Sequence, residues 1–231
     1  MPLDHASNTL PFTWRAHMST LDLALNNTDP SVRLNAALGA GIKPSLLDLD
    51  LLLDRCAVEP DFQVREMLTW ALIRLPVEVA VPRLIGELSH KKAQARSQAL
   101  HTLSKFRDVS AWEAVAARLD DEDQEVVRTA WYAAVALVPE RKRHWLAEKL
   151  AVRLGEGDEK RQLSLSRALV GLGGDIIEPV LDAAGQRGDN RVRVHASATE
   201  KLLHDPNAAF GLSLKRARKE VALGKTRSAK G

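Results

Sequence analysis

Cysteine is nearly absent from this sequence: Cys56 is the only one among 231 residues. A single thiol excludes an intrachain disulfide and a cysteine-based metal cluster. Long apolar runs are missing too: the richest stretch, residues 46–53, is interrupted by Asp48 and Asp50. No segment of the sequence is therefore expected to span a membrane. The first residues lack the basic and apolar segments of a secretory signal. We therefore expect a soluble, cytoplasmic protein without a membrane segment.

The motifs of common enzyme classes are also missing. There is no Gly-x-Gly-x-x-Gly after a strand, no Walker A sequence and no Gly-x-Ser-x-Gly. The glycines at 171, 173 and 174 follow a helical stretch, where they are typical of a helix end. The seven histidines show no His-x-x-x-His spacing. These absences predict a protein that is not an enzyme and that holds no metal and no cofactor.

Aromatic residues make up only 4% of the chain, and Ala and Leu dominate its apolar residues. This bias favours helix packing over a β-sandwich, and no sustained period-2 alternation indicates a strand. The chain carries a net charge of +3. Residues 215–231 contain seven basic residues and one glutamate, a net charge of +6, so the rest of the chain carries −3.

A repeat of about 32 residues is the strongest pattern present. Arginines recur at intervals of 31 to 33 residues, and each opens an amphipathic helical stretch preceded by another. Asp29, Asp61 and Asp189 stand four residues before their arginines, where they can cap the second helix. The pattern predicts an all-α chain of about six helix pairs, at residues 19–43, 44–76, 77–107, 108–140, 141–173 and 174–205. The recurring arginines are Arg33, Arg65, Arg96, Arg128, Arg161 and Arg193.

The unit of two helices with Asp-x-x-Val-Arg-x-x-Ala at the second resembles the HEAT repeat family, over residues 19–205. It is most similar to short bacterial HEAT-like proteins grouped with phycobilin lyases. The resemblance implies a right-handed α-solenoid, in which the arginines form a ladder of ion pairs between successive repeats. Two units depart from the pattern: Lys160-Arg161 replaces Val-Arg in the fifth, and Ser89-His-Lys-Lys92 replaces the acidic turn in the third.

The residues 1, 4, 5 and 8 positions after each arginine lie opposite the buried face of the second helix. In a HEAT solenoid this side lines a concave groove. The groove predicted here is weakly charged, whereas binding to a nucleic-acid duplex requires many basic residues. Its aromatic and apolar groups favour a protein or peptide partner. We therefore expect a monomeric, non-catalytic scaffold or adaptor, with the partner-binding residues Glu66, Trp70, Ile73, His101, Tyr132 and Leu165.

Two alternatives remain open. Residues 206–231 are expected to form a capping helix and a basic tail, where Lys215, Arg216, Arg218 and Lys219 could contact nucleic acid or an acidic partner. The alkylpurine DNA glycosylases share a HEAT-like fold and hold a carboxylate beside aromatic residues, as Glu66 stands near Trp70 here. Residues 1–18 precede the repeat pattern, and we expect them to be a disordered extension or to lie before the true translation start.

Overall fold

The computed structural model describes residues 20–187, 189–205, 215, 218–219 and 221–222. Within these residues every regular element is a helix, as predicted, and there is no strand. Three short 3-10 turns, Leu46–Asp48, Val109–Ala111 and Glu140–Lys142, lead into α3, α7 and α9. The α-helices are α1 Thr20–Leu25, α2 Pro30–Ile42, α3 Leu49–Cys56, α4 Phe62–Leu72, α5 Val77–Glu87, α6 Ala93–Phe106, α7 Trp112–Ala116, α8 Gln124–Leu137, α9 Arg143–Ala151, α10 Glu159–Gly171, α11 Gly174–Arg187 and α12 Asn190–His204.

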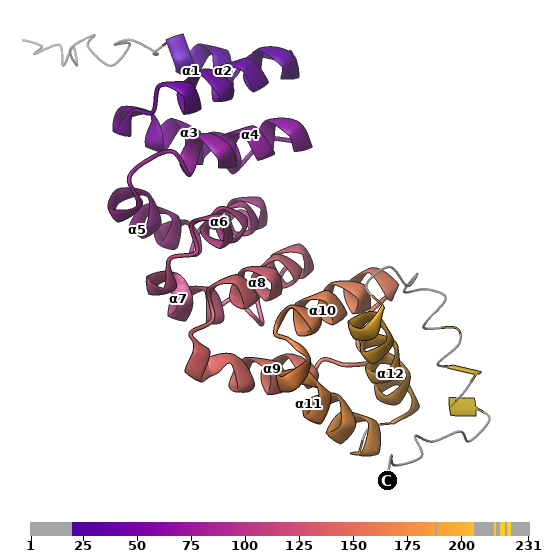
Figure 1. Ribbon diagram of the computed structural model, residues 1–231. Helices are drawn as coiled ribbons and strands as arrows, with labels where there is room; N and C mark the ends of the chain where they lie inside the picture. The colour runs from indigo at the N-terminus through magenta and orange to yellow at the C-terminus, as the bar shows by residue number, and fades with distance from the viewer. Residues whose placement is uncertain (1–19, 188, 206–214, 216–217, 220, 223–231) are drawn as a thin grey trace, which may run out of the picture.

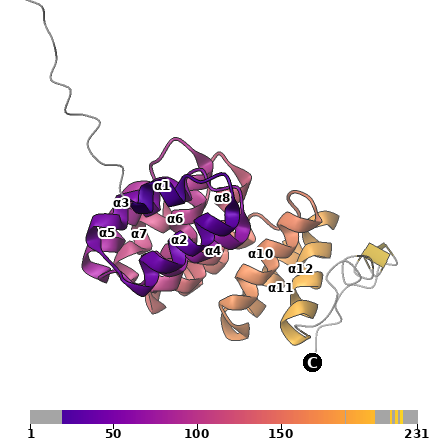
Figure 2. The ribbon, with the colours of Figure 1, turned by 90° about the horizontal axis from the view of Figure 1, so that it is seen from above.

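Successive helices pack as antiparallel pairs, and the pairs stack into an α-solenoid (Figure 1). We call the odd-numbered helices A helices and the even-numbered ones B helices. From α1 to α8 the A helices form one column and the B helices the other (Figure 1). After α8 the last two helix pairs turn toward the side of the B helices. Viewed from above, α10 and α12 therefore lie beside the stack formed by α1 to α8 (Figure 2). The B helices therefore line the inner, concave side.

Aspartates set the start of most B helices. Asp29, Asp61, Asp123, Asp158 and Asp189 each accept hydrogen bonds from backbone N–H groups in the first turn of the following helix. The capping role predicted for Asp29, Asp61 and Asp189 is confirmed. The helix α6 differs, because it follows Lys92 and has no side-chain cap.

The recurring arginines are not all equivalent when counted from these caps. Arg33, Arg65, Arg96 and Arg193 stand four residues after the capping position. Arg128 stands five residues after Asp123, and Arg161 stands three residues after Asp158. A one-residue change turns a helical side chain by about 100°. Arg128 and Arg161 therefore point in other directions than the remaining four arginines.

The predicted ladder of ion pairs forms at two positions. The buried guanidinium of Arg33 donates to both carboxylate oxygens of Glu59 at 2.8 Å, in the loop before the next B helix. Arg96 donates in the same way to Asp121, at 3.0 and 2.7 Å. Both acids stand two residues before the cap of the following B helix.

The ladder prediction is wrong for Arg65, Arg128 and Arg161, which find partners in their own repeat or on neutral groups; for Arg193 the following unit lies largely outside the described residues. Arg65 donates to the carbonyl oxygens of residues 59 and 60. In the next repeat, the position two residues before the cap holds His90 in place of an acid, so Arg65 finds no carboxylate there. The shifted arginines pair mainly within their own repeat, Arg128 with residue 125 and Arg161 with residues 156 and 124. Arg193 contacts residue 190.

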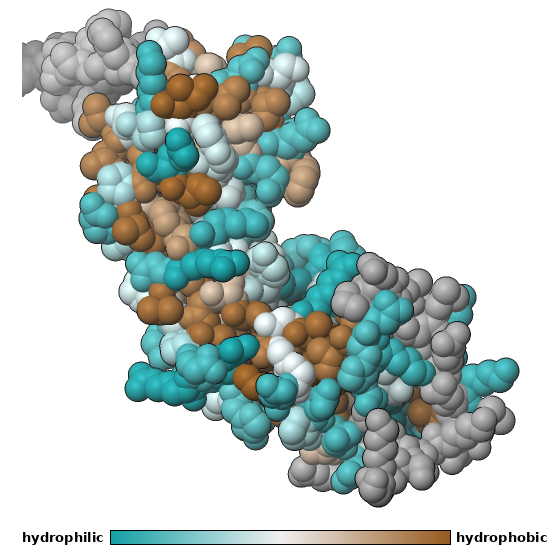
Figure 3. Space-filling model, viewed as in Figure 1, coloured by the Kyte–Doolittle hydropathy of each residue, from teal (hydrophilic) through white to brown (hydrophobic). Residues whose placement is uncertain are grey.

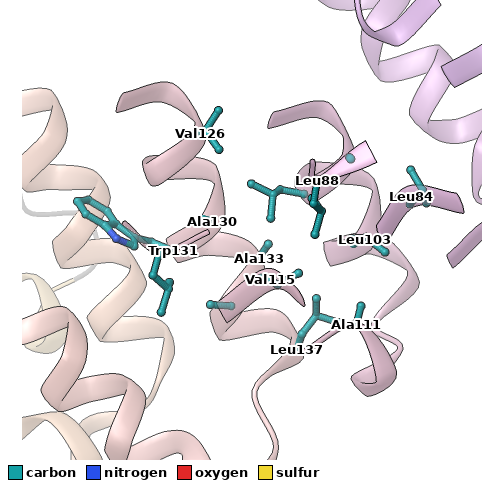
Figure 4. Close-up of a cluster of buried hydrophobic side chains, with 14 of the residues drawn as sticks. Leu84, Leu88, Leu103, Ala111, Val115, Val126, Ala130, Trp131, Ala133 and Leu137 are labelled. Carbon is teal, nitrogen blue, oxygen red and sulfur yellow. The ribbon is translucent and has the colours of Figure 1, made fainter. Parts of the chain in front are cut away.

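One hydrophobic core runs between the A and B columns, from Leu25 to Ala196. Its middle is formed where α5, α6, α7 and α8 meet, with Leu84 and Leu103 fully buried there, while the buried Trp131 points from α8 to the side of α10 (Figure 4). A smaller cluster on α12 is formed by Val194, Ala198 and Leu202, and Val221 packs against it. Such a continuous core requires each pair to bury its apolar face on its neighbours.

The two ends of the chain fall largely outside the described residues. The predictions for residues 1–18, and for Arg216 in the tail, cannot be compared with the structure because these residues lie outside it. In the tail, Lys215, Arg218 and Lys219 are helical and exposed.

Candidate functional site

One side chain per B helix forms a row along the concave side. The ninth residue after the cap lies about 180° from the buried side of a B helix, and so faces away from the A helices. We call the resulting row the inner row. It includes three of the predicted partner-binding residues, and two residues that the prediction did not name. From α2 to α10 the inner row is Leu38, Trp70, His101, Tyr132 and Arg167.

Every member of the inner row is partly or fully open to solvent. Leu38 is 36% exposed and Tyr132 is 56% exposed. These fractions are large for apolar and aromatic side chains in a solenoid whose core is otherwise closed. Apolar and hydrophilic patches alternate along the array on the face that Figure 3 shows. The inner row itself mixes an aliphatic, two aromatic, an imidazole and a guanidinium side chain, so it offers a series of contact points and not one continuous apolar surface.

Trp70 is held against the neighbouring B helix. Its ring fills the space beside Gly41 of α2, where a Cβ atom would collide with the ring. The guanidinium of Arg74, four residues further on in the turn that follows α4, lies 5.3 Å from the ring centroid. Trp70 thus stabilises the packing of α2 on α4 and also presents part of its ring to the concave side.

Glu66 and His101 meet between α4 and α6. The His101 Nε2 atom lies 3.1 Å from a Glu66 carboxylate oxygen, although the approach does not have hydrogen-bond geometry. Burial lowers the pKa of His101, Lys105 lowers it further, and Glu66 opposes both. The imidazole is therefore neutral near neutral pH, and its contact with Glu66 is a weak polar one.

Tyr132 projects from α8 next to α6. The ammonium group of Lys105 lies 5.9 Å from the centroid of its ring. Nearby, the hydroxyl groups of Ser97 and Thr129 lie 2.8 Å apart and also join α6 to α8. Tyr132 is the most exposed aromatic side chain of the inner row, so its ring is free to contact a partner.

The prediction for Leu165 is wrong, because this side chain is 1% exposed and belongs to the core. The arginine used to count positions, Arg161, stands one residue earlier in its helix than its counterparts. The exposed residue at the equivalent place is Arg167. Ile73, the sixth predicted contact, is half-buried at the end of α4.

Three cations stand on the concave side and were missing from the prediction. Arg74 and Lys105 lie thirteen residues after the caps of α4 and α6, and Arg167 belongs to the inner row. All three are exposed. The sequence could have indicated Arg74 and Lys105, since they follow Trp70 and His101 by one helical turn. The predicted list ended eight residues after each arginine and so stopped just before them.

Another hollow lies on the surface of the described residues. An open groove of about 480 Å³ lies between the A helices α9 and α11, with Val152 and Val180 among its lining residues. Within the described residues no group of three or more metal-binding side chains comes together. In the same part of the chain, no helix is long and apolar enough to cross a membrane.

One protein family model matches part of the chain. Residues 49–136 match the family model described as HEAT repeats. No curated protein matches the sequence. Among solved structures, the chain is similar to the crystal structure of an engineered protein from the Northeast Structural Genomics Consortium, with 19% sequence identity and a TM-score of 0.46. That match covers 88% of this chain and 96% of the engineered one.

Proposed function

Starting from the HEAT repeats of residues 49–136, we propose that this protein is a non-catalytic scaffold or adaptor that binds a protein segment along its concave side. HEAT repeats commonly mediate protein binding. The partner lies across the B helices and contacts the inner row. This proposal does not extend to a lyase activity, for which the described residues offer no supporting observation.

The observation that carries the proposal is the run of exposed or half-exposed apolar and aromatic side chains on four successive B helices. Leu38, Trp70, His101 and Tyr132 occupy the same helical position, on the side away from the core. Aromatic anchors of this kind supply much of the binding energy at protein interfaces. Trp70 is fixed by its packing on α2, so little side-chain entropy is lost when a partner covers it.

The charges of the concave side also favour a protein partner over a nucleic-acid duplex. Affinity for a duplex comes from many contacts between basic side chains and phosphates. The B helices α4 to α10 present Arg74, Lys105 and Arg167 there, together with the acidic Glu66. The glycosylase alternative requires a carboxylate that acts in catalysis. Glu66, the candidate for that role, lies against the imidazole of His101, so this carboxylate already has a polar neighbour within the protein.

The test is a quantitative capture experiment with an exposed aromatic group removed. Wild type, Tyr132→Ala and Val109→Ala are immobilised, and the proteins retained from an extract are identified and then titrated individually. Val109 is the matched control, because it is 60% exposed and precedes the A helix α7. We expect Tyr132→Ala to weaken partner binding about tenfold or more, and Val109→Ala to leave it unchanged.

A chain ending at Leu214 separates this proposal from the nucleic-acid alternative. The shortened chain keeps its partner if the concave side is the binding site. If removal of the basic tail abolishes all binding, and the lost ligand is a nucleic acid with steep salt dependence, the proposal is wrong.

A further inference from the structure

We infer, on the premise of the proposed function, that the bound segment is an extended acidic peptide whose carboxylates pair with Arg74, Lys105 and Arg167. The apolar side chains of the same peptide contact the inner row. This assigns a chemical class to the partner and a recognition role to three cations.

The first support is the absence of acidic partners for these cations. Within the part of the chain that the structure describes, no carboxylate oxygen lies within ion-pair distance of any of the three. Being unpaired is not unique to them: within the described residues Arg83 pairs with Asp50, whereas Lys43 and Arg107 have no ion pair either. What sets the three apart is that they share the concave side, where a ligand carboxylate can reach them.

The second support is the way in which two of the cations are placed. Arg74 lies 5.3 Å from the ring of Trp70, and Lys105 lies 5.9 Å from the ring of Tyr132. Cation–π attraction of this kind restrains a long side chain that would otherwise sample many rotamers. The restraint lowers the entropy cost of pairing with a ligand carboxylate.

The third support is a match of spacing. Packed helices are separated by about 8–10 Å. Three residues of an extended polyproline II segment span about 9 Å. A peptide that crosses the B helices therefore presents every third side chain to the next helix. Acidic residues about three positions apart can reach Arg74 and Lys105 on neighbouring helices, while Glu66, two turns before Arg74, disfavours acidic side chains nearer the start of α4.

Single-stranded nucleic acid is the competing ligand, because it too combines negative charge with groups that stack on aromatic rings. Two features favour the peptide. Arg74 and Lys105 already lie over the rings of Trp70 and Tyr132, where a base would have to stack. Glu66 places a negative charge on the same side, which a peptide can meet with a neutral residue, whereas every linkage of a nucleic-acid strand carries a phosphate.

The experiment uses a display library of random peptides of roughly 12 residues, the length that spans α2 to α10 at these spacings. Peptides are selected on the full-length wild-type protein, and the enriched ones are synthesised with a fluorescent label and titrated by anisotropy. We expect an excess of Asp and Glu, and a loss of about tenfold or more in affinity when these residues are replaced by Ser. Binding should weaken as salt concentration rises.

Charge-reversal variants test the named residues. Arg74→Glu with Lys105→Glu should abolish binding of the acidic peptides, and Arg83→Glu should not, because Arg83 lies on an A helix and pairs with Asp50. Circular dichroism of each variant checks that its helix content is kept.

Each of the other outcomes contradicts the inference, the proposed function or both. Enriched peptides without an acidic bias, whose binding still requires Tyr132, overturn the inference and leave the proposed function intact. Acidic peptides that bind equally well to Tyr132→Ala and to the charge-reversed protein overturn both. No enrichment overturns the inference alone. Displacement of the peptides by polyuridylate at low concentration, with a steep salt slope, assigns the surface to single-stranded nucleic acid instead.

Discussion

Replacing Glu59 by glutamine should destabilise the first half of the array strongly. The Glu59 carboxylate is fully buried and accepts four hydrogen bonds: two from the Arg33 guanidinium, one from Arg55 and one from the backbone N–H of Asp61. These partners belong to α2, to α3 and to the cap of α4. A single carboxylate thereby joins three consecutive helices.

Two routes give the size of the effect. Glutamine keeps the shape of the side chain but leaves the charge of Arg33 buried without a counterion, which costs about 3–5 kcal/mol. Burial alone would raise the pKa of Glu59, but the bonds from Arg33, Asp61 and Arg55 outweigh it and lower the pKa from 4.5 to about 2. That difference corresponds to about 3 kcal/mol of stability, in agreement with the first route.

The assay is denaturant unfolding followed by circular dichroism, near neutral pH and along a series toward low pH. The contribution of Glu59 is fully present above pH 4.5 and is lost as pH falls toward about 2. The stability gap between wild type and Glu59→Gln should therefore close over that interval. The control is Glu125→Gln, whose exposed ion pairs are worth less than about 1 kcal/mol. If Glu59→Gln unfolds at the wild-type denaturant concentration near neutral pH, the reasoning is refuted.

Four further substitutions have calculable outcomes. Gly41→Ala should lower the unfolding free energy by about 1–3 kcal/mol, because the added Cβ atom collides with Trp70. Gly86→Ala should raise it by about 0.5–1 kcal/mol, because the added Cβ atom meets open space in α5. Equal melting temperatures for the two variants would contradict this. Burial lowers the pKa of His195 to about 4, so wild type should lose about 3 kcal/mol between pH 6.5 and 4, and His195→Gln should lack that loss in pH titrations of stability. Arg128→Ala should change the denaturation midpoint little, by less than about 1 kcal/mol, because its partner is an exposed residue of its own helix.

The sequence predicted the helix pairs well because each pair depends on local patterns. An aspartate before an amphipathic stretch both caps the helix and fixes which face is buried, as at Asp61. The errors arose where the arginine spacing was used in place of the cap. Arg128 and Arg161 keep the spacing of about 32 residues. Counted from the cap of its helix, however, Arg128 stands one residue later than the other arginines and Arg161 one residue earlier. That shift misplaced Leu165, which is buried.

The sequence predicts only in part which of the ladder's ion pairs form. An arginine forms an inter-repeat ion pair when an acid stands two residues before the next cap, as Glu59 does, and loses it when that residue is His90. In the acidic run before α8, any of four carboxylates could have met Arg96; only the folded loop places Asp121 there. The contact between Trp70 and Gly41 joins two repeats and has no local sequence signal.

The most direct test of the central claim is the dissociation constant of one identified partner segment, measured for wild type and for Tyr132→Ala under identical salt conditions. Loss of this exposed aromatic ring should weaken binding about tenfold or more while the melting temperature stays close to that of wild type. Equal dissociation constants for the two proteins would contradict the assignment of the concave side as the binding surface.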